Sequence, residues 1–329
     1  MTSSQSSSIK GAVRVPAFAK INLSLLVLYK RPDGFHELRT VFQTISLADR
    51  LEIAWRPGRG ARVAVECEPP IDDNIAGRAA QKVLEATNAR GEVSIRIEKR
   101  IPIGGGMGGG SSDAAAVLLT LPILTRRPMP ESKLHDLAAG LGSDVAFFLM
   151  GGTTLGSGRG EELYPLESVR ERFGLVVLPG AAVSTAEAYR GLAREPLTDL
   201  TQQGFSPRMK EFQSMVRSLQ CLDPRHGWKA FCENDFEAAV FAQHPSLKSL
   251  QQKLQRLGAR PVRMSGSGSA LFGLFASRQK QVEAARAFAR VEAGVRVERI
   301  SFLSREQYRA AWFRSLGRLV RNKKWPPQS

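Results

Sequence analysis

Cysteine is scarce in this chain of 329 residues, and its three copies at positions 67, 221 and 232 lie far apart. An odd number of scattered cysteines indicates neither a disulfide framework nor a zinc site. No stretch reaches the roughly 20 uninterrupted apolar residues of a membrane-spanning helix. The Ser-rich segment 1–8 lacks the apolar run of a secretory signal and is expected to be disordered. Together these absences predict a cytoplasmic protein without an integral membrane segment.

Two binding signatures are missing as well. The main glycine cluster is not followed by the Gly-Lys-Ser/Thr of a Walker A loop. No aromatic and basic ribonucleoprotein motif is present, so we expect no nucleic-acid partner. The net charge of +16 by itself suits a nucleic acid, an acidic lipid surface or a polyanionic small molecule. A nucleic-acid-binding protein therefore stays the alternative from another class, although it leaves the lysine and aspartate discussed below unexplained.

The length exceeds what one hydrophobic core usually serves, so two domains are expected. Strand and helix patterns follow each other in mixed order, which predicts an α+β fold in both halves. We place the domains at 10–171 and 172–304, followed by a basic tail at 305–329. Strands are expected at 13–28, 40–45, 50–54, 93–97, 174–178, 262–265, 270–275 and 295–302, with a hairpin at 153–166. Helices are expected at 75–88, 114–121, 132–141, 185–192 and 279–289, with two or three more between 206 and 257 and a polar loop at 198–203.

The strongest local feature is a glycine cluster in which six of the seven residues from Gly104 to Gly110 are glycine. Glycine permits positive φ angles and lets the backbone approach a ligand closely. The cluster follows an apolar strand pattern and runs directly into an Ala-rich helix, whose first N–H groups lack partners within the helix. Backbone amides and the helix dipole then form an anion site. The alternative without a binding role is a flexible linker. Such linkers seldom lie between an apolar strand and an Ala-rich helix.

Three segments in this order resemble the motifs of the GHMP kinase superfamily, namely 16–23, 102–116 and 264–272. The resemblance implies a two-domain α+β fold with an N-terminal domain like ribosomal protein S5 domain 2 and a ferredoxin-like C-terminal domain. It also implies ATP as the cofactor, with Mg²⁺ carried by the nucleotide. Ser111 could assist the ion, and the sequence identifies no certain metal ligand. The positions implied for ATP binding are Pro102, Gly104, Gly105, Gly106, Gly108, Gly109, Gly110, Ser111 and Ser112. Gly266, Ser267 and Gly268 match the third motif, a turn packed beside the phosphate loop.

The resemblance also implies a catalytic pair, Lys20 and Asp144. Phosphoryl transfer needs an aligned hydroxyl, charge neutralisation and a proton acceptor. Asp144 is expected to accept the proton of the acceptor hydroxyl, and Lys20 to keep Asp144 ionised. Asn22 lies two residues beyond Lys20 on the same strand face and is expected to hydrogen-bond that hydroxyl. The purely structural alternatives are a helix N-cap for Asp144 and a solvated strand face for Lys20.

The segment 31–38 indicates which alcohol is phosphorylated. It resembles the branch of the superfamily that phosphorylates the 2-hydroxyl of 4-diphosphocytidyl-2-C-methyl-D-erythritol, where an aromatic residue and a histidine hold the cytosine. Phe35 and His36 match that pair, since a ring offers a stacking face and an imidazole a hydrogen bond. Thr185 is expected near the same cleft, although Ser184 and Thr185 would also suit an ordinary helix cap. The alternative is another GHMP kinase, acting on homoserine or mevalonate.

The tail carries apolar residues at helical spacing among basic ones. A basic amphipathic helix can bind an acidic membrane surface weakly. A terminal helix that docks on its own protein is the favoured explanation of the pattern, and Gly317 is expected to interrupt the helix. The apolar positions concerned are Tyr308, Trp312, Leu316, Leu319 and Val320.

Overall fold

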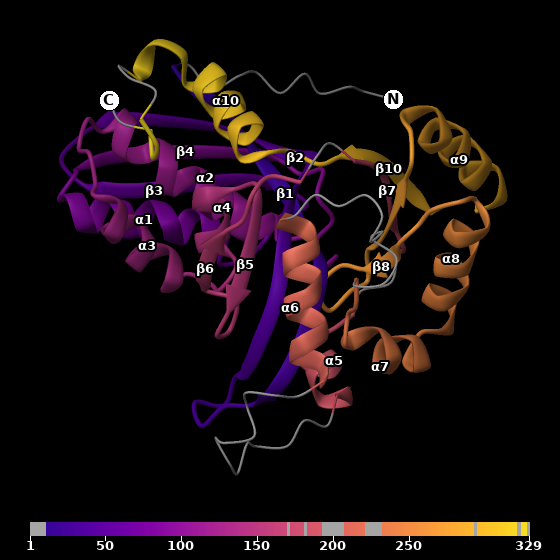
Figure 1. Cartoon of the computed structure of the whole chain (residues 1–329). Helices are drawn as coiled ribbons and strands as arrows, with labels where there is room; N and C mark the ends of the chain where they lie inside the picture. The colour runs from indigo at the N-terminus through magenta and orange to yellow at the C-terminus, as the bar shows by residue number, and fades with distance from the viewer. Residues whose placement is uncertain are drawn as a thin grey trace.

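The computed structural model contains two α+β units joined through the long hairpin at the start of the chain (Figure 1). The sequence-based expectations of a disordered segment at 1–8 and a loop at 198–203 lie outside the described residues. The structure describes residues 11–169, 172–180, 183–192, 207–220, 232–292, 295–320 and 324–327.

The first unit is built around two long antiparallel strands, β1 (Val13–Lys30) and β2 (His36–Pro57). The turn between them is closed by a hydrogen bond of 2.7 Å from the Arg31 N–H to the Phe35 carbonyl. The sequence predicted two separate strands where β2 is a single strand of 22 residues. It remains continuous because β1 pairs with it along nearly its whole length.

Four shorter strands complete this sheet. The order is β3-β4-β2-β5-β6, with β1 beside β2. Strand β3 was not predicted, although Val63, Val65 and Cys67 alternate with the exposed Ala64, Glu66 and Glu68 along the sheet edge. The four strands are β3 (Ala61–Glu68), β4 (Gly91–Glu98), β5 (Thr153–Ser157) and β6 (Glu162–Pro165).

The helices of the first unit pack with this sheet around one core. Asn74 caps α1, since its side-chain oxygen accepts from the Ala76 N–H at 3.0 Å. Helix α2 is buried from Ser112 to Ile123, which explains its lack of a polar face. Its position in the core holds the preceding glycine loop in place. The helices are α1 (Ile75–Thr87), α2 (Gly109–Leu124), α3 (Glu131–Ala139) and α4 (Val145–Met150).

The second unit has a four-stranded antiparallel sheet in the order β10-β7-β9-β8. This is the order expected of a ferredoxin-like domain. The strands are β7 (Phe173–Leu178), β8 (Val262–Met264), β9 (Leu271–Phe275) and β10 (Arg296–Ser301). Its helices are α5 (Thr185–Gly191), α6 (Pro207–Gln220), α7 (Phe236–Gln243), α8 (Pro245–Arg256) and α9 (Arg278–Val291).

The end of the chain returns to the first unit as α10 (Arg305–Leu316), followed by the short 3₁₀ turn η3 (Gly317–Leu319). The helix ends at Gly317, as predicted. Tyr308, Trp312 and Leu316 are buried in the core of the first unit. The expected contact of the tail with an acidic surface is therefore not supported, because its apolar face is already occupied by the protein itself.

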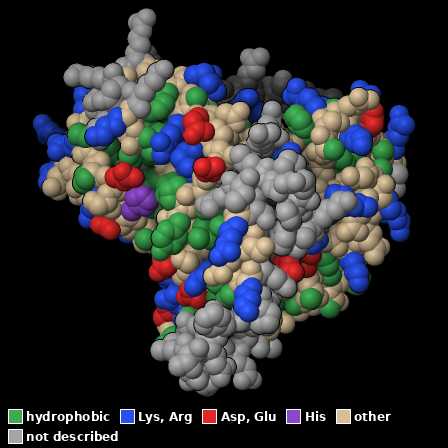
Figure 2. Space-filling view, in the orientation of Figure 1, with side chains coloured by type: hydrophobic (Ala, Val, Ile, Leu, Met, Phe, Trp, Pro, Cys, Tyr) green, Lys and Arg blue, Asp and Glu red, His purple; other side chains and the backbone are tan. Residues whose placement is uncertain are grey.

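The basic charge is spread over the molecule. Figure 2 shows Lys and Arg side chains on both halves of the visible face, interspersed with Asp and Glu. Within the part of the chain that the structure describes, no helix is long and apolar enough to cross a bilayer.

Candidate active site

The glycine loop forms a wall between two cavities. Gly104, Gly106 and Gly108 have φ angles of +72°, +72° and +69°, a conformation that side chains with a Cβ rarely adopt. Helix α2 begins directly after Gly108, so its free N–H groups face the loop. The loop lines a cavity of about 340 Å³, where backbone amides and the helix terminus suit phosphate groups.

A second glycine turn, from Ser265 to Ser269, packs against this loop. The Ser265 hydroxyl donates to the Gly106 carbonyl at 3.0 Å, and the Ala270 N–H donates to the Gly105 carbonyl at 3.3 Å. A Cβ on Gly106 would lie 2.1 Å from the Ser265 carbonyl oxygen. The two turns thus approach more closely than any residue with a side chain allows.

Lys20 lies buried on β1 beside the loop, with 4% of its surface exposed. Its ammonium donates to the Asn22 side-chain oxygen at 2.7 Å, and the Asn22 amide donates to the Thr40 hydroxyl at 2.8 Å. The backbone N–H of Lys20 also donates to the backbone carbonyl of Met107 at 3.1 Å. The alternating polar face of β1 is therefore an interior face of the cleft, which excludes the solvated-strand interpretation of Lys20.

Asp144 occupies the position before α4, but its side chain makes no capping hydrogen bond. One of its carboxylate oxygens lies 3.4 Å from the Lys20 ammonium. About a third of the side chain, 32%, is exposed. Asp144 is therefore paired with a buried cation and remains accessible to a ligand in the cleft, as a proton acceptor must be.

A cavity of about 560 Å³ brings most predicted acceptor-side residues together. It shares Gly106 and Gly108 with the smaller cavity, so the loop separates the two spaces. Two ligands bound on either side would meet near Lys20 and Asp144. The predicted residues in its wall are Lys20, Asn22, Phe35, His36, Asp144, Thr185, Gly266 and Ser267.

The far end of this larger cavity is aromatic. Phe35 is 52% exposed, and the His36 ring stacks on Tyr189 at 4.7 Å between centroids. Tyr189 in turn contacts Phe236 edge to face at 4.8 Å. Burial and the nearby Lys30 lower the pKa of His36, so its imidazole is neutral at pH 7. A neutral imidazole next to the exposed Phe35 ring offers both hydrogen bonding and stacking to a planar base.

The remaining predicted residues divide between the two sides. All of the predicted phosphate-loop residues except Ser112 line the smaller cavity. The Ser112 hydroxyl instead donates to the Phe18 carbonyl at 2.7 Å, which ties α2 to β1. The Thr185 and Ser267 hydroxyls lie 2.9 Å apart and join α5 to the second glycine turn. Contacts of these residues with ATP or acceptor stay predictions.

A buried charge cluster beneath the glycine loop was missed by sequence reasoning. The Lys99 ammonium contacts Asp49 at 2.5 Å and Asp113 at 2.8 Å, and all three side chains are buried. Burial opposes the charge of Lys99, but the two carboxylates outweigh it and raise its pKa. Burial also raises the pKa of Asp113 to about 7. Asp49 accepts from two backbone N–H groups, of Arg100 and Ile101, so this cluster anchors the segment between β4 and the glycine loop.

Asn234 was also missed, because it lies outside the three motifs. Its amide donates to the carbonyls of Met264 and Gly266, each at 2.8 Å. The residues on either side of it hydrogen-bond to Leu25 of β1. This segment therefore links the strand that carries Lys20 to the second glycine turn. Nothing in the local sequence distinguishes it from an ordinary helix cap.

A fold with two α+β units, a glycine loop at a helix start and a buried lysine paired with an accessible aspartate in the cleft is typical of a small-molecule kinase. The family model described as the GHMP kinases N-terminal domain matches residues 74–152, and that of the GHMP kinases C-terminal domain matches residues 205–293. The chain belongs to the GHMP kinase family and is thus a phosphotransferase.

Two curated relatives carry the same name, 4-diphosphocytidyl-2-C-methyl-D-erythritol kinase. The one from Solibacter usitatus is 48% identical over 313 residues, covering 95% of this chain and 96% of the relative. The one from Acaryochloris marina is 38% identical, covering 82% and 89%. A crystal structure of 4-(cytidine 5'-diphospho)-2C-methyl-D-erythritol kinase is 36% identical with a TM-score of 0.71, covering 88% of this chain and 98% of that one. A homoserine kinase from Cytophaga hutchinsonii has the same TM-score at 18% identity, with coverage of 91% and 96%, and shares the fold.

Proposed function

We propose that this protein transfers the γ-phosphoryl group of ATP to the 2-hydroxyl of 4-diphosphocytidyl-2-C-methyl-D-erythritol, within the non-mevalonate route to isoprenoid precursors. One observation carries the proposal: a single cavity holds the Lys20–Asp144 pair near the glycine loop and the Phe35–His36 pair at the other end. The 48% identity over 95% of the chain to a relative of that name supports it. We place the reaction in the cytoplasm, as the sequence composition predicts.

The chemistry follows from the positions of the charged groups. An acceptor hydroxyl beside Asp144 can lose its proton to that carboxylate as its oxygen attacks the γ-phosphorus. The bond from the γ-phosphorus to the bridging oxygen breaks, and ADP leaves with that oxygen. Lys20, 3.4 Å from Asp144, supplies a positive charge that offsets the negative charge near the attacking oxygen. We expect the Asn22 amide, which donates to the Thr40 hydroxyl, to orient the acceptor hydroxyl.

The glycine loop fits the phosphates of ATP, because a Cβ at Gly106 would collide with the neighbouring turn and the loop amides border the smaller cavity. Mg²⁺ commonly binds through phosphates with few protein ligands, and the Ser111 hydroxyl lines this cavity. We propose that Ser111 assists the ion and that the ATP phosphates hold most of it. When bound, the ion neutralises phosphate charge.

Product formation with three alcohols tests the assignment. The enzyme, ATP and Mg²⁺ are incubated with 4-diphosphocytidyl-2-C-methyl-D-erythritol, homoserine or mevalonate, and phosphorylated product is quantified. We expect phosphorylation of the first alcohol alone. CMP should compete with this acceptor and not with ATP, since the two ligands occupy different cavities. Preferential phosphorylation of homoserine or mevalonate would retain the kinase fold and overturn the substrate.

A further inference from the structure

The diphosphate of the proposed acceptor needs a positively charged partner in the larger cavity. This diphosphate lies between the cytosine, expected at Phe35 and His36, and the hydroxyl, expected at Lys20 and Asp144. A diphosphate in a partly enclosed cleft needs a cationic or N–H partner to offset its loss of solvation. The cavity wall contains two Lys or Arg side chains among the described residues, Lys20 and Arg159.

Lys20 is already engaged at the hydroxyl end. Its ammonium contacts Asn22 at 2.7 Å and Asp144 at 3.4 Å, and it is almost fully buried. Moving it to the diphosphate would leave the Asp144 carboxylate without its cation during the transfer. The cation for the diphosphate must therefore come from elsewhere in the wall.

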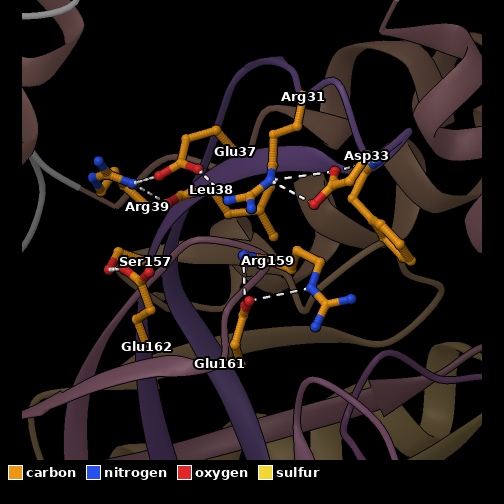
Figure 3. A network of polar contacts seen from close by, with 10 residues as sticks. Arg31, Asp33, Glu37, Leu38, Arg39, Ser157, Arg159, Glu161 and Glu162 are labelled. Carbon is orange, nitrogen blue, oxygen red and sulfur yellow. Dashed lines mark hydrogen bonds and ion pairs between the residues drawn. The ribbon is translucent and has the colours of Figure 1, made fainter. Parts of the chain in front are cut away.

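Arg159 lies at the turn between β5 and β6, at the aromatic end of the cavity. Its guanidinium carbon is 4.7 Å from the centre of the Phe35 ring. Its Nε donates to the Glu161 carboxylate at 3.1 Å, and the same carboxylate accepts from the Arg159 backbone N–H at 2.6 Å. Figure 3 shows this arrangement, with the two terminal nitrogens of Arg159 outside the drawn contacts.

The neighbouring arginines on this rim are occupied differently. The Arg31 guanidinium contacts both Asp33 and Glu37, and that of Arg39 contacts Glu37 and the Leu38 carbonyl. Neither residue lines the larger cavity. In the described part of the chain, neither terminal nitrogen of Arg159 donates to another protein group. Two N–H groups on a fixed guanidinium match a phosphate oxygen pair.

We propose that Arg159 binds the diphosphate of the acceptor through its two terminal nitrogens, and that Glu161 is a positioning residue that holds the guanidinium beside Phe35. Arg159 thereby distinguishes a nucleotide-linked alcohol from a free one. This inference rests on the proposed function, because it assumes a cytidine diphosphate group in the cavity.

Binding of a ligand series to the full-length protein tests the proposal. The dissociation constants of cytidine, CMP and CDP are measured by calorimetry at constant ionic strength for the wild type, Arg159→Ala, Arg159→Lys, Glu161→Gln and the control Arg31→Ala. Charge-assisted hydrogen bonds of this kind correspond to about 10- to 100-fold in affinity. We expect Arg159→Ala to weaken CDP binding by that factor, while cytidine binding weakens by about fivefold or less, as loss of an exposed cation–π contact alone would produce.

The other variants refine the result. Arg159→Lys should restore part of the CDP affinity, because the charge remains and the bidentate geometry is lost. Glu161→Gln should weaken CDP less than Arg159→Ala, and Arg31→Ala should match the wild type. Equal losses for cytidine and CDP in Arg159→Ala, or no loss for either, would overturn the diphosphate contact. Failure of all three ligands to bind the wild type would instead overturn the proposed function itself.

Discussion

At the scale of single residues, the site depends on a lysine that the fold has removed from water. A buried ammonium is costly unless it is paired and hydrogen-bonded. Lys20 has both kinds of partner, since Asn22 accepts from it and Asp144 supplies the opposite charge. The pairing restricts Lys20 to one position, directly behind the point where the acceptor hydroxyl is expected.

Asp144→Asn tests the role of the carboxylate in this pair. Removing a general base typically lowers kcat by about 10² or more. We expect that loss with little change in the Kd of ATP, because Asp144 lines only the acceptor cavity. The measurement is steady-state kinetics with calorimetric ATP binding, and Asp136→Asn, an exposed acid on α3, is the matched control. Turnover close to that of the control would rule out Asp144 as the base.

Lys99 is a second buried lysine with a different task. It neutralises two buried carboxylates, Asp49 and Asp113. Lys99→Met would leave these charges without a cation, and breaking a buried ion pair on one side costs about 3–5 kcal/mol. We expect a loss of that size in the free energy of unfolding, measured by urea denaturation. The neighbouring Arg100→Met is the control, since its pair with Glu98 is largely exposed and worth about 0–1 kcal/mol. Similar losses in both variants would refute the anchoring role.

At the scale of elements, the phosphate loop is shaped by what packs behind it. Helix α2 is buried and begins where the loop ends, and the turn from Ser265 to Ser269 presses against the loop from the other side. The loop is therefore held between two elements. Its amides are fixed before any nucleotide arrives, which lowers the ordering cost of binding.

Alanine substitutions at two loop glycines test the packing between the two turns. An added Cβ would collide with the second turn at Gly106 but has room at Gly105. Gly106 has φ +72° and its added Cβ would lie 2.1 Å from the Ser265 carbonyl, whereas at Gly105 the nearest atoms are 3.5 Å away. We expect Gly106→Ala to weaken ATP binding by at least about tenfold, since left-handed strain and a backbone collision add to more than about 1.4 kcal/mol. Gly105→Ala should have a clearly smaller effect on the Kd of ATP, measured by calorimetry. Equal effects would mean that packing between the two turns does not shape the site.

At the scale of the whole molecule, the C-terminal helix α10 is part of the core of the first unit. Helix α10 inserts Tyr308 and Trp312 into the core of the first unit, and the Tyr308 hydroxyl donates to the Phe148 carbonyl of α4. The ring of Trp325 packs against both aromatic residues. Helix α4 starts beside Asp144, so the tail supports the element that positions the catalytic carboxylate.

Trp312→Ala measures that support. Trp312 is 1% exposed, and replacing a buried tryptophan with alanine costs about 3–5 kcal/mol. We expect a drop of that size in the free energy of unfolding. Leu319→Ala, at a residue 41% exposed, should stay within about 0.5 kcal/mol of the wild type. If Trp312→Ala behaved like Leu319→Ala, the tail would not be part of the core. We also expect the wild type not to bind anionic vesicles, because the apolar face of α10 is buried. Co-sedimentation with vesicles checks this.

Much of the local structure was predictable, since short-range backbone preferences decide it. The Gly104–Gly110 loop, the Asn74 cap and the helix end at Gly317 follow from φ preferences and from hydrogen bonds between near neighbours. The α+β class followed from the periodicity of apolar residues. The polar face of β1 could not be assigned in this way, because the same alternation suits a solvated strand and a strand lining a cleft.

The sequence by itself determined the loop, its helix and the motif resemblance that names Lys20, Asp144, Phe35 and His36. Only the tertiary structure decided that Arg159 lies 4.7 Å from Phe35, that Asn234 joins β1 to the second glycine turn and that the tail fills a core. The physical reason is one of range. A turn or cap depends on atoms a few residues away, whereas these contacts join residues 30 or more positions apart. They exist because two sheets and a terminal helix bury their apolar faces together, and no local pattern specifies which side chains that packing brings to one cavity.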